Sequence, residues 1–306
     1  MGGRVCAELG VTQCAHEERE FDDGEHKARP LIDVARADVY VVQSLHGDRL
    51  HSANDKLCRL LFFIGALSDA GAARVTAVVP YLAYARKDKR TRENDPVTTR
   101  YVATLFEAVG TDGIMAVDVH NVAAFQNAFR CRTAHIETQS LFAATIAPLV
   151  AGRCVTVVAP DAGATFRAHL LRQALSKALG ATVGAAFAEK HRSGGELSGD
   201  LLVGDVNGKD VIVIDDLIAT GSTLVRTATT CRRLGANRVI AAATHGLFTG
   251  DAAAILGGDA IDRLIVTDTV PPFRLQHGLV RDRLTIVGSA PLLAGAIRRA
   301  HADAPN

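Results

Sequence analysis

The chain has 306 residues, of which 48% are hydrophobic and 22% are charged, a composition typical of globular proteins with packed cores. Its formal net charge is +1, so no overall basic field points to DNA or RNA as a partner. No apolar run approaches the roughly 18 residues that a membrane-spanning helix needs, and the first residues lack the hydrophobic core of a signal peptide.

Cysteine usage points to a reducing compartment. The six cysteines are scattered along the chain, and no two of them form a CxxC pair. In a chain of this length they indicate reduced thiols, not a disulfide framework or a zinc site. The length itself predicts about two domains. We therefore expect a cytoplasmic protein whose partners include neither a membrane nor nucleic acid.

The predicted strands are short runs rich in Val and Ile, each followed by a stretch of helical length such as 56–70 or 223–234. The runs are, in chain order, Asp38–Ser44, Val75–Pro80, Ile114–Asp118, Val155–Pro160, Val211–Asp215, Val239–Thr244, Leu264–Thr267 and Leu284–Val287. Near-continuous apolar strands suit parallel sheets that are covered on both faces. The alternation therefore predicts an α/β fold with doubly wound parallel sheets.

Several of these strands end in polar residues, among them Asp118, Asp161 and Asp215. In open parallel sheets, ligands bind beyond the carboxyl ends of the strands, so we expect the chemistry at these positions. A domain boundary is predicted near residues 137–150, between a turn that contains His135 and the next strand.

The most specific segment is Val211–Leu224, VIVIDDLIATGSTL, in which a buried strand runs into two acids, a turn and a helix. Gly221 can adopt backbone conformations that are closed to other residues, and the following helix N-terminus offers unpaired amides to a phosphate. Asp215 and Asp216 lie within reach of a sugar's hydroxyls. The alternative reading, that these residues only cap a helix, requires just one of them and leaves the others unexplained.

This segment resembles the phosphoribosyl-binding signature that phosphoribosyltransferases and ribose-phosphate pyrophosphokinases share. The resemblance implies that Asp215 and Asp216 bind the 2- and 3-hydroxyls of the ribose. It assigns the 5-phosphate to Thr220, Gly221, Ser222 and Thr223. By itself it does not choose between the two enzyme classes.

Two segments of the first half resemble motifs of the pyrophosphokinases. The sequence FDDGE at residues 21–25 is similar to their F-x-D-G-E, in which the aromatic ring stacks on adenine and the acids help to read the base. The resemblance implies that Phe21, Asp23 and Glu25 bind ATP. Considered alone, the segment reads as an acidic surface turn.

The second such segment, PYLAYARKDKR at residues 80–90, is similar to the family's P-Y-x-x-Y-A-R-Q-D-K/R. The resemblance implies that Arg86, Lys87 and Asp88 bind ATP, with Arg86 on the triphosphate. A basic cluster of this kind is most often a solvated face. At a strand tip, however, Arg and Lys can form charge-assisted hydrogen bonds to phosphate oxygens.

Two further matches concern a metal. Asp118-Val119-His120 resembles D-L-H, whose histidine helps to hold ATP-bound magnesium, although on softness grounds His120 alone would read as a core histidine. Residues 159–167, APDAGATFR, resemble S-P-D-x-G-x-x-x-R, whose aspartate lies near a second metal and the ribose. Asp161 is a carboxylate, the ligand type that magnesium prefers. The resemblance therefore implies Mg²⁺ as cofactor, with His120 and Asp161 as ligands.

A flexible catalytic segment is implied farther along the chain. Lys190 and Arg192 match the K-x-R of the family's mobile flap, where the two cations stabilise charge on the β-phosphate. The sequence SGG at residues 193–195 supplies the hinge that a flap needs. Finally, VTDTVP at residues 266–271 resembles the family's V-T-N-T-I-P.

These matches occur in family order from Phe21 to a helix near 292–300, so the chain resembles a ribose-phosphate pyrophosphokinase. Such enzymes transfer the β,γ-pyrophosphoryl group of ATP-Mg to the anomeric hydroxyl of ribose 5-phosphate, giving phosphoribosyl pyrophosphate and AMP. The resemblance implies two phosphoribosyltransferase-type domains. The ATP-side domain would comprise residues 1–138, with a C-terminal helix at about 290–306 packed on it, and the ribose-5-phosphate domain residues 139–289. Homo-oligomers built from dimers, up to hexamers, are also implied.

Three departures from the family pattern stand out. Ala219 replaces a third acid of the ribose loop, and Lys87 replaces a glutamine and adds a charge beside the expected triphosphate. The third departure is at the N-terminus. The family has an opening strand before the region that matches Val5–Val11, and this chain has almost nothing before that region. Two alternatives remain open: a phosphoribosyltransferase acting on a nucleobase, which is expected to lack the ATP-side motifs, and a non-catalytic regulatory homologue.

Overall fold

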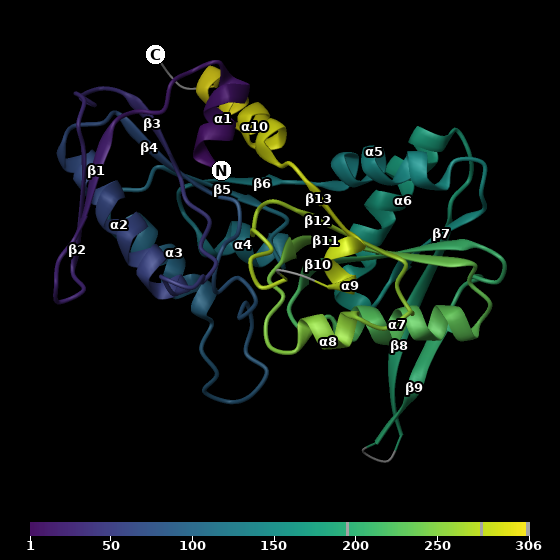
Figure 1. Ribbon diagram of the computed structural model, residues 1–306. Helices are drawn as coiled ribbons and strands as arrows, with labels where there is room; N and C mark the ends of the chain where they lie inside the picture. The colour runs from purple at the N-terminus through teal and green to yellow at the C-terminus, as the bar shows by residue number, and fades with distance from the viewer. Residues whose placement is uncertain (194–195, 276–277, 304–306) are drawn as a thin grey trace. The chain divides into compact units, whose positions relative to one another are not determined.

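The computed structural model describes residues 1–193, 196–275 and 278–303 and divides the chain into two compact units (Figure 1). For residues 189–193, 196–200 and 279 it describes the backbone only. Unit 1 contains Met1–Ile136 and Ser289–Asn306, and unit 2 contains Glu137–Gly288. Unit 1 is therefore discontinuous in sequence, whereas unit 2 is one continuous stretch.

Unit 1 contains a four-stranded parallel sheet with the strand order β3-β4-β5-β6. The strands are β3 (Asp38–Val42), β4 (Arg74–Val79), β5 (Gly113–Val117) and β6 (Arg132–Ile136). Apolar side chains on one face pack against α2 (Ala53–Asp69), α3 (Thr98–Ala108) and α4 (Val122–Ala128). The other face packs against α1 (Gly2–Leu9) and α10 (Ala290–Ala302), which lie side by side (Figure 1).

Helix α2 shows why these segments become helices. Its buried residues recur at the spacing of one helical face: Leu57, Leu60, Leu61, Ile64 and Leu67. A capping box begins it, because Ser52 Oγ accepts a hydrogen bond from Asp55 N at 3.2 Å while Ser52 N donates to Asp55 Oδ2 at 2.7 Å. The box satisfies two backbone donors that a helix start otherwise leaves unpaired.

An antiparallel hairpin of β1 (His16–Glu20) and β2 (His26–Pro30) forms a separate two-stranded sheet in unit 1. Its strands are mostly polar, and β2 packs against α2. A tilted contact between the His16 and Phe63 rings, whose centroids are 5.7 Å apart, holds the hairpin against that helix. An ion pair between Arg59 Nη2 and Glu20 Oε1 at 3.0 Å does so as well.

Unit 2 contains a seven-stranded sheet with the order β13-β12-β11-β10-β7-β8-β9, in which only the β8–β9 pair is antiparallel. Its strands are β7 (Val155–Ala159), β8 (Gly184–Ser193), β9 (Glu196–Val203), β10 (Asp210–Ile218), β11 (Arg238–Gly246), β12 (Arg263–Thr267) and β13 (Leu284–Val287). The helices are α5 (Gln139–Val150), α6 (Thr165–Leu179), α7 (Ser222–Arg233), α8 (Ala252–Leu256) and α9 (Leu279–Asp282), with a 3₁₀ turn η1 at Ala162–Ala164. Helices α5 and α6 cover one face, and α7 and α8 cover the other.

The prediction of an α/β fold with parallel sheets covered on both faces is confirmed, and every predicted apolar run coincides with a strand. One local prediction is wrong. His135 lies in strand β6, not in a turn, and residues 139–150 form helix α5. The error has a physical cause, because β6 (RTAHI) is short and half-buried and carries little of the apolar signal of its neighbours.

Among the described residues, the longest apolar helical stretches remain too short or too polar to cross a membrane.

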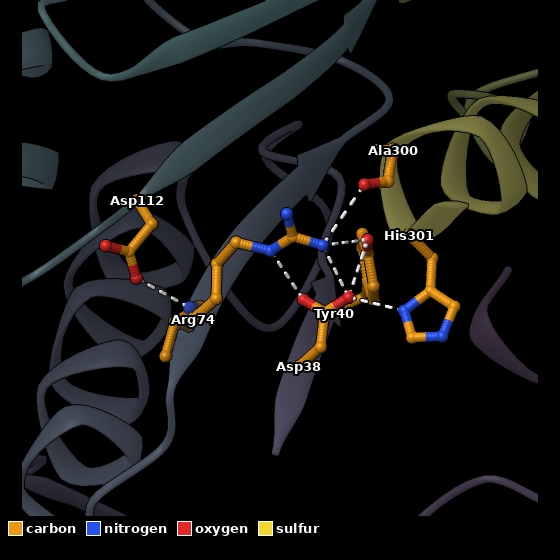
Figure 2. A network of polar contacts seen from close by, with 7 residues as sticks. Asp38, Tyr40, Arg74, Asp112, Ala300 and His301 are labelled. Atoms are coloured by element: carbon orange, nitrogen blue, oxygen red, sulfur yellow. Dashed lines mark hydrogen bonds and ion pairs between the residues drawn. The ribbon is translucent and has the colours of Figure 1, made fainter. Parts of the chain in front are cut away.

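A polar network joins α10 to the start of β3 and β4 (Figure 2). The Arg74 guanidinium donates to both carboxylate oxygens of Asp38, at 2.7 and 2.5 Å, to the Tyr40 hydroxyl at 3.0 Å and to the Ala300 carbonyl at 3.1 Å. His301 Nδ1 lies 2.6 Å from Asp38 Oδ2. The network therefore ties the last helix of the chain to the first strands of the sheet.

Burial shapes the titration of this network. Burial by itself would raise the pKa of Asp38, but hydrogen bonds from Arg74, His301 and Tyr40 lower that pKa below its usual value. Burial together with the Asp38 carboxylate raises the pKa of Tyr40 to about 12. Asp38 is therefore the charged centre of the network, and Arg74 is its main counter-ion.

Substituting Arg74→Ala should destabilise unit 1, because it leaves the Asp38 carboxylate, whose side chain is only 15% exposed, without its bidentate partner. Breaking such a pair costs about 3 kcal/mol. We expect faster hydrogen exchange in peptides from β3 and α10, measured by mass spectrometry in urea. The control is Arg132→Ala, an exposed arginine at the start of β6 in the same sheet. Equal exchange in both variants would contradict the role given to Arg74.

Candidate functional site

The tip of the β1–β2 hairpin contains the FDDGE segment. Gly24 adopts a left-handed conformation, with φ of 88°, and its N–H donates to the Phe21 carbonyl at 2.9 Å. Asp23 Oδ1 accepts from the Glu25 backbone N–H at 3.0 Å, so one of the predicted base-reading acids also shapes the turn. The Phe21 ring is 37% exposed, and the Arg19 guanidinium lies over it at 4.7 Å from the centroid. The turn thus presents an aromatic ring and acids at the surface of unit 1.

The connection from β4 to α3, residues 80–97, is called the basic loop below. Arg86, Lys89 and Arg90 are exposed, whereas Lys87 and Asp88 are half-buried. Lys87 Nζ lies 2.7 Å from Asp95 Oδ2, and Asp88 Oδ2 accepts from Asn121 Nδ2 at 2.7 Å. The predicted ATP-binding residues of this loop therefore divide into an exposed arginine and two side chains held by other residues of unit 1.

The segment after β5 contains Asp118 and His120. Asp118 is buried and has a φ of +39°, which a residue with a side chain rarely adopts. Its Oδ1 lies 3.8 Å from His135 Nε2 on β6. His120 is exposed, and the next residue, Asn121, caps α4 by accepting from Ala124 N at 3.1 Å.

Backbone strain concentrates in these two connections. Of the five non-glycine residues with positive φ in the described part of the chain, Tyr84 and Asn94 lie in the basic loop and Asp118 follows β5. Such conformations cost about 1–3 kcal/mol each and persist where the surroundings hold them, most often at functional sites. The strain independently points to the same edge of the unit 1 sheet as the motifs do.

In unit 2, Asp161 follows β7 directly. Its Oδ1 accepts from Gly163 N at 3.0 Å and from Ala164 N at 3.2 Å, so this oxygen caps η1. Among the described residues, no hydrogen-bond partner is assigned to Oδ2. Arg167, at the end of the same segment, is half-buried, and its Nε also has no hydrogen-bond partner in the described part. The segment can offer one carboxylate oxygen and one cation to a ligand.

The predicted phosphate loop lies between β10 and α7. Gly221 has a φ of +83°, and a Cβ there would lie 2.6 Å from Leu256 Cδ2. Both the conformation and the space therefore require glycine. Gly221 is also the N-cap of α7 and makes no side-chain cap, while Ser222 N donates a long hydrogen bond of 3.5 Å to Thr220 Oγ1. The Thr220 and Ser222 hydroxyls, 3.2 Å apart, lie beside these backbone donors. This arrangement of amides and hydroxyls suits a phosphate.

The two acids before this loop are electrostatically coupled. Asp216 is buried, Asp215 is half-buried, and Asp216 N donates to Asp215 Oδ1 at 2.8 Å. Burial, followed by the hydrogen bond and charge of Asp216, raises the pKa of Asp215 to about 8. Two carboxyl groups in one buried place favour a ligand that supplies hydroxyl donors or positive charge.

A cluster of buried hydroxyls stands at the neighbouring strand ends of unit 2. Thr267 Oγ1 donates to the Thr244 carbonyl at 2.6 Å, and Thr269 Oγ1 lies 2.8 Å from His245 Nδ1. Thr138 Oγ1 and Thr244 Oγ1 are 3.0 Å apart. The VTDTVP segment supplies the two threonines of β12 and its following turn. These hydrogen bonds connect the ends of β11 and β12, and β11 pairs with β10, the strand that carries Asp215 and Asp216.

Lys190 and Arg192 lie on β8, where a register irregularity separates them, but their side chains are outside the described part of the chain, and so are residues 194 and 195.

The residues that the sequence did not single out are Asp95 and Asn121. Their partners lie 8 and 33 positions away in the sequence, so only the structure pairs them with Lys87 and Asp88.

Comparisons with known proteins agree across the chain. Residues 1–110 match the N-terminal domain of ribose phosphate pyrophosphokinase, and residues 198–305 match the phosphoribosyl synthetase-associated domain. The chain is 33% identical to the ribose-phosphate pyrophosphokinase of Caldanaerobacter subterraneus subsp. tengcongensis over 98% of its length and 91% of that protein's. It is 36% identical to that of Pasteurella multocida over 91% of its length and 85% of that protein's.

A solved structure gives the same result. The phosphoribosylpyrophosphate synthetase of Mycobacterium smegmatis superposes with a TM-score of 0.86 and 35% identity, covering 98% of this chain and 95% of that one. Both the fold and the sequence thus lead to one assignment. The chain belongs to the ribose-phosphate pyrophosphokinase family.

Proposed function

We propose that the protein is an enzyme that transfers the β,γ-pyrophosphoryl group of ATP to the anomeric hydroxyl of ribose 5-phosphate. The products are phosphoribosyl pyrophosphate and AMP. The observation that carries the proposal is the junction of β10 and α7, where two adjacent acids at the end of the strand precede a helix start around a glycine that cannot be replaced. Family membership supplies the reaction, and this connection supplies a site with the chemistry of a sugar phosphate.

Unit 2 would bind ribose 5-phosphate. The backbone amides at the start of α7, with the hydroxyls of Thr220, Ser222 and Thr223, would hold the 5-phosphate. Asp215 and Asp216 would accept hydrogen bonds from the ribose 2- and 3-hydroxyls. The absence of an acid at Ala219 leaves these two carboxylates as the acids of the loop.

Unit 1 would bind ATP. Phe21 offers an aromatic surface to the adenine, and Asp23 and Glu25 stand beside it on the same turn. Arg86 is the exposed cation nearest in sequence to the strained Tyr84, and it would bind the triphosphate through charge-assisted hydrogen bonds.

Magnesium would accompany the nucleotide. The described residues contain no group of three or more His, Cys, Asp or Glu side chains that could hold a metal ion by themselves. Magnesium commonly keeps several waters and binds through substrate phosphates with one or two protein ligands, and a carboxylate such as that of Asp161 is the ligand type it prefers. On unit 1, the exposed His120 would be such a ligand for ATP-bound magnesium. On unit 2, the outer oxygen of Asp161 would be one for a second magnesium ion. When bound, Mg²⁺ offsets negative charge on the phosphate oxygens.

The reaction would be an in-line attack of the anomeric oxygen on the β-phosphorus. The bond between the β-phosphorus and the oxygen that joins it to the α-phosphate breaks, and that oxygen leaves with AMP. Such a transfer requires mainly positioning and charge neutralisation from the protein, without a covalent nucleophile. Arg86, Lys190 and Arg192 would supply the positive charge.

The proposal is tested by incubating the purified protein with ATP, Mg²⁺ and ribose 5-phosphate and following the products by chromatography. We expect AMP and phosphoribosyl pyrophosphate in equal amounts, formed only when the sugar is present. A folded protein that forms neither product would contradict the proposal and favour the non-catalytic homologue. Consumption of phosphoribosyl pyrophosphate with a nucleobase, without ATP, would favour the phosphoribosyltransferase.

Substituting Lys190→Ala should lower turnover at least a hundredfold while the fold survives. Removing one preorganised donor to a developing charge costs on the order of 3 kcal/mol of transition-state stabilisation. The matched control is Lys177→Ala, an exposed lysine in the last turn of α6. Steady-state kinetics and circular dichroism measure the two effects. Wild-type turnover in the Lys190 variant would rule out the flap assignment.

The raised pKa of Asp215 gives a signed prediction for stability. Between its ordinary value of 3.8 and about 8, the folded chain holds a proton on this group that the unfolded chain has released. Raising the pH through this range therefore lowers the free energy of unfolding. Asp215→Asn cannot ionise, so its melting temperature relative to wild type should increase from pH 5 to pH 8, measured without ligand. The variant Asp259→Asn, at an exposed site, is the control and should show no such trend.

A further inference from the structure

We propose that Asp95 and Asn121 are positioning residues that fix the conformation of the basic loop. Lys87 then stabilises the loop through its contact with Asp95. The side chains of Arg86, Lys89 and Arg90 remain available to bind the phosphates of the nucleotide. The two contacts, Lys87–Asp95 and Asp88–Asn121, are together called the loop clamp. The inference deepens the proposed function and rests on it where it concerns ATP. The existence of the clamp rests on unit 1 alone.

Asp95 is the first half of the clamp. Its Oδ2 accepts from Lys87 Nζ at 2.7 Å, from Thr91 Oγ1 at 2.6 Å, and from the backbone N–H groups of Thr91 and Arg92, both at 3.0 Å. The hydrogen bond from Lys87, followed by those from Thr91, holds the pKa of Asp95 well below its usual value. One charged oxygen thus gathers the middle of the basic loop around itself.

Asn121 is the second half. Its Nδ2 donates to Asp88 Oδ2 at 2.7 Å, while its Oδ1 accepts from Ala124 N at 3.1 Å and caps α4. The same side chain therefore begins a helix and holds the loop. Because Asn121 directly follows His120, this hydrogen bond also links the basic loop to the second ATP-side segment of unit 1.

The base of the loop is fixed as well. The buried Thr99 hydroxyl, in the first turn of α3, donates to the carbonyls of Tyr84 at 3.0 Å and of Lys87 at 3.2 Å. Two residues of the loop adopt left-handed conformations: Tyr84, which precedes Lys87, with φ of 65°, and Asn94, which directly precedes Asp95, with φ of 63°. Contacts at both ends and in the middle are what can keep such strained residues in place.

The clamp decides which charges face solvent. Lys87 is 35% exposed and has its ammonium group on Asp95, so its charge is offset within the loop. Arg86, Lys89 and Arg90 are exposed. A polyphosphate site on this loop would therefore use these three cations, without Lys87. The charge that Lys87 adds relative to the family's glutamine is therefore matched by an acid of the same loop. A preformed loop also loses less conformational entropy when a ligand binds.

Trypsin tests the clamp without reference to activity, because the loop contains five cleavage sites: Arg86, Lys87, Lys89, Arg90 and Arg92. Asp95→Ala removes the first half. Asn121→Asp replaces the donor to Asp88 with a second carboxylate, which repels Asp88, while the aspartate still caps α4. We expect both variants to be cut in the loop at least five times faster than wild type in the native state. Asn127→Ala, an exposed asparagine on the same helix, is the control and should be cut at the wild-type rate.

A polarity swap makes the test specific. In the double variant Asp88→Asn with Asn121→Asp, the new asparagine can donate to the new aspartate, so the hydrogen bond returns in the opposite direction. We expect the double variant to approach the wild-type cleavage rate. A double variant cut as fast as Asn121→Asp alone would overturn the second half of the clamp.

The link to the nucleotide is tested by calorimetry and kinetics. Asp95→Ala and Asn121→Asp should weaken ATP-Mg binding and raise the KM for ATP at least fivefold, while the KM for ribose 5-phosphate changes less than twofold. The swap should restore most of the ATP affinity. Unchanged cleavage rates and ATP affinities in both variants would overturn the inference. A wild-type protein that binds no ATP would instead refute the proposed function, and the trypsin rates would still decide whether the clamp exists.

Discussion

The burial of parallel strands on both faces is the constraint on which the functional sites depend. Strands such as β4, β5 and β7 are buried along nearly their whole length, because helices cover each side of their sheet. Polar and strained residues are then confined to the connections that follow the carboxyl ends of the strands. Asp118 and Asp161 lie in such connections, and the Asp215–Asp216 pair lies in the last four residues of β10. The site chemistry is thus a consequence of how the cores are packed.

This constraint also explains what the sequence could predict. The run VIVI at residues 211–214 is apolar and is followed directly by two acids. Both the strand and the functional residues at its carboxyl end can therefore be predicted without a structure. The same holds for the glycine at 221, which the structure requires for its backbone conformation and for the space occupied by Leu256. Strands with weaker apolar character, β6 and the polar hairpin of β1 and β2, were not readable in this way.

Side-chain partnerships lay beyond the sequence for a different reason. Lys87 was predicted as a nucleotide ligand because a family motif places it there. The sequence does not show that its ammonium group forms an ion pair with Asp95. Asn121 and Asp88 belong to separate connections that only the β4–β5 pairing brings to the same edge of the sheet. Motifs record which residue types occur, whereas hydrogen bonds between distant residues depend on the folded backbone.

The discontinuity of unit 1 has a consequence for how the protein is made. A ribosome completes all of unit 2, residues 137–288, before it synthesises α10. Until then the apolar face formed by Val78, Met115 and Val117 lacks the side chains of α10 that cover it, and Asp38 lacks its contact with His301. Unit 2 is thus made as one continuous segment, whereas the core of unit 1 is complete only once α10 has been added. The order of synthesis, and not only the final contacts, therefore sets when each unit can complete its core.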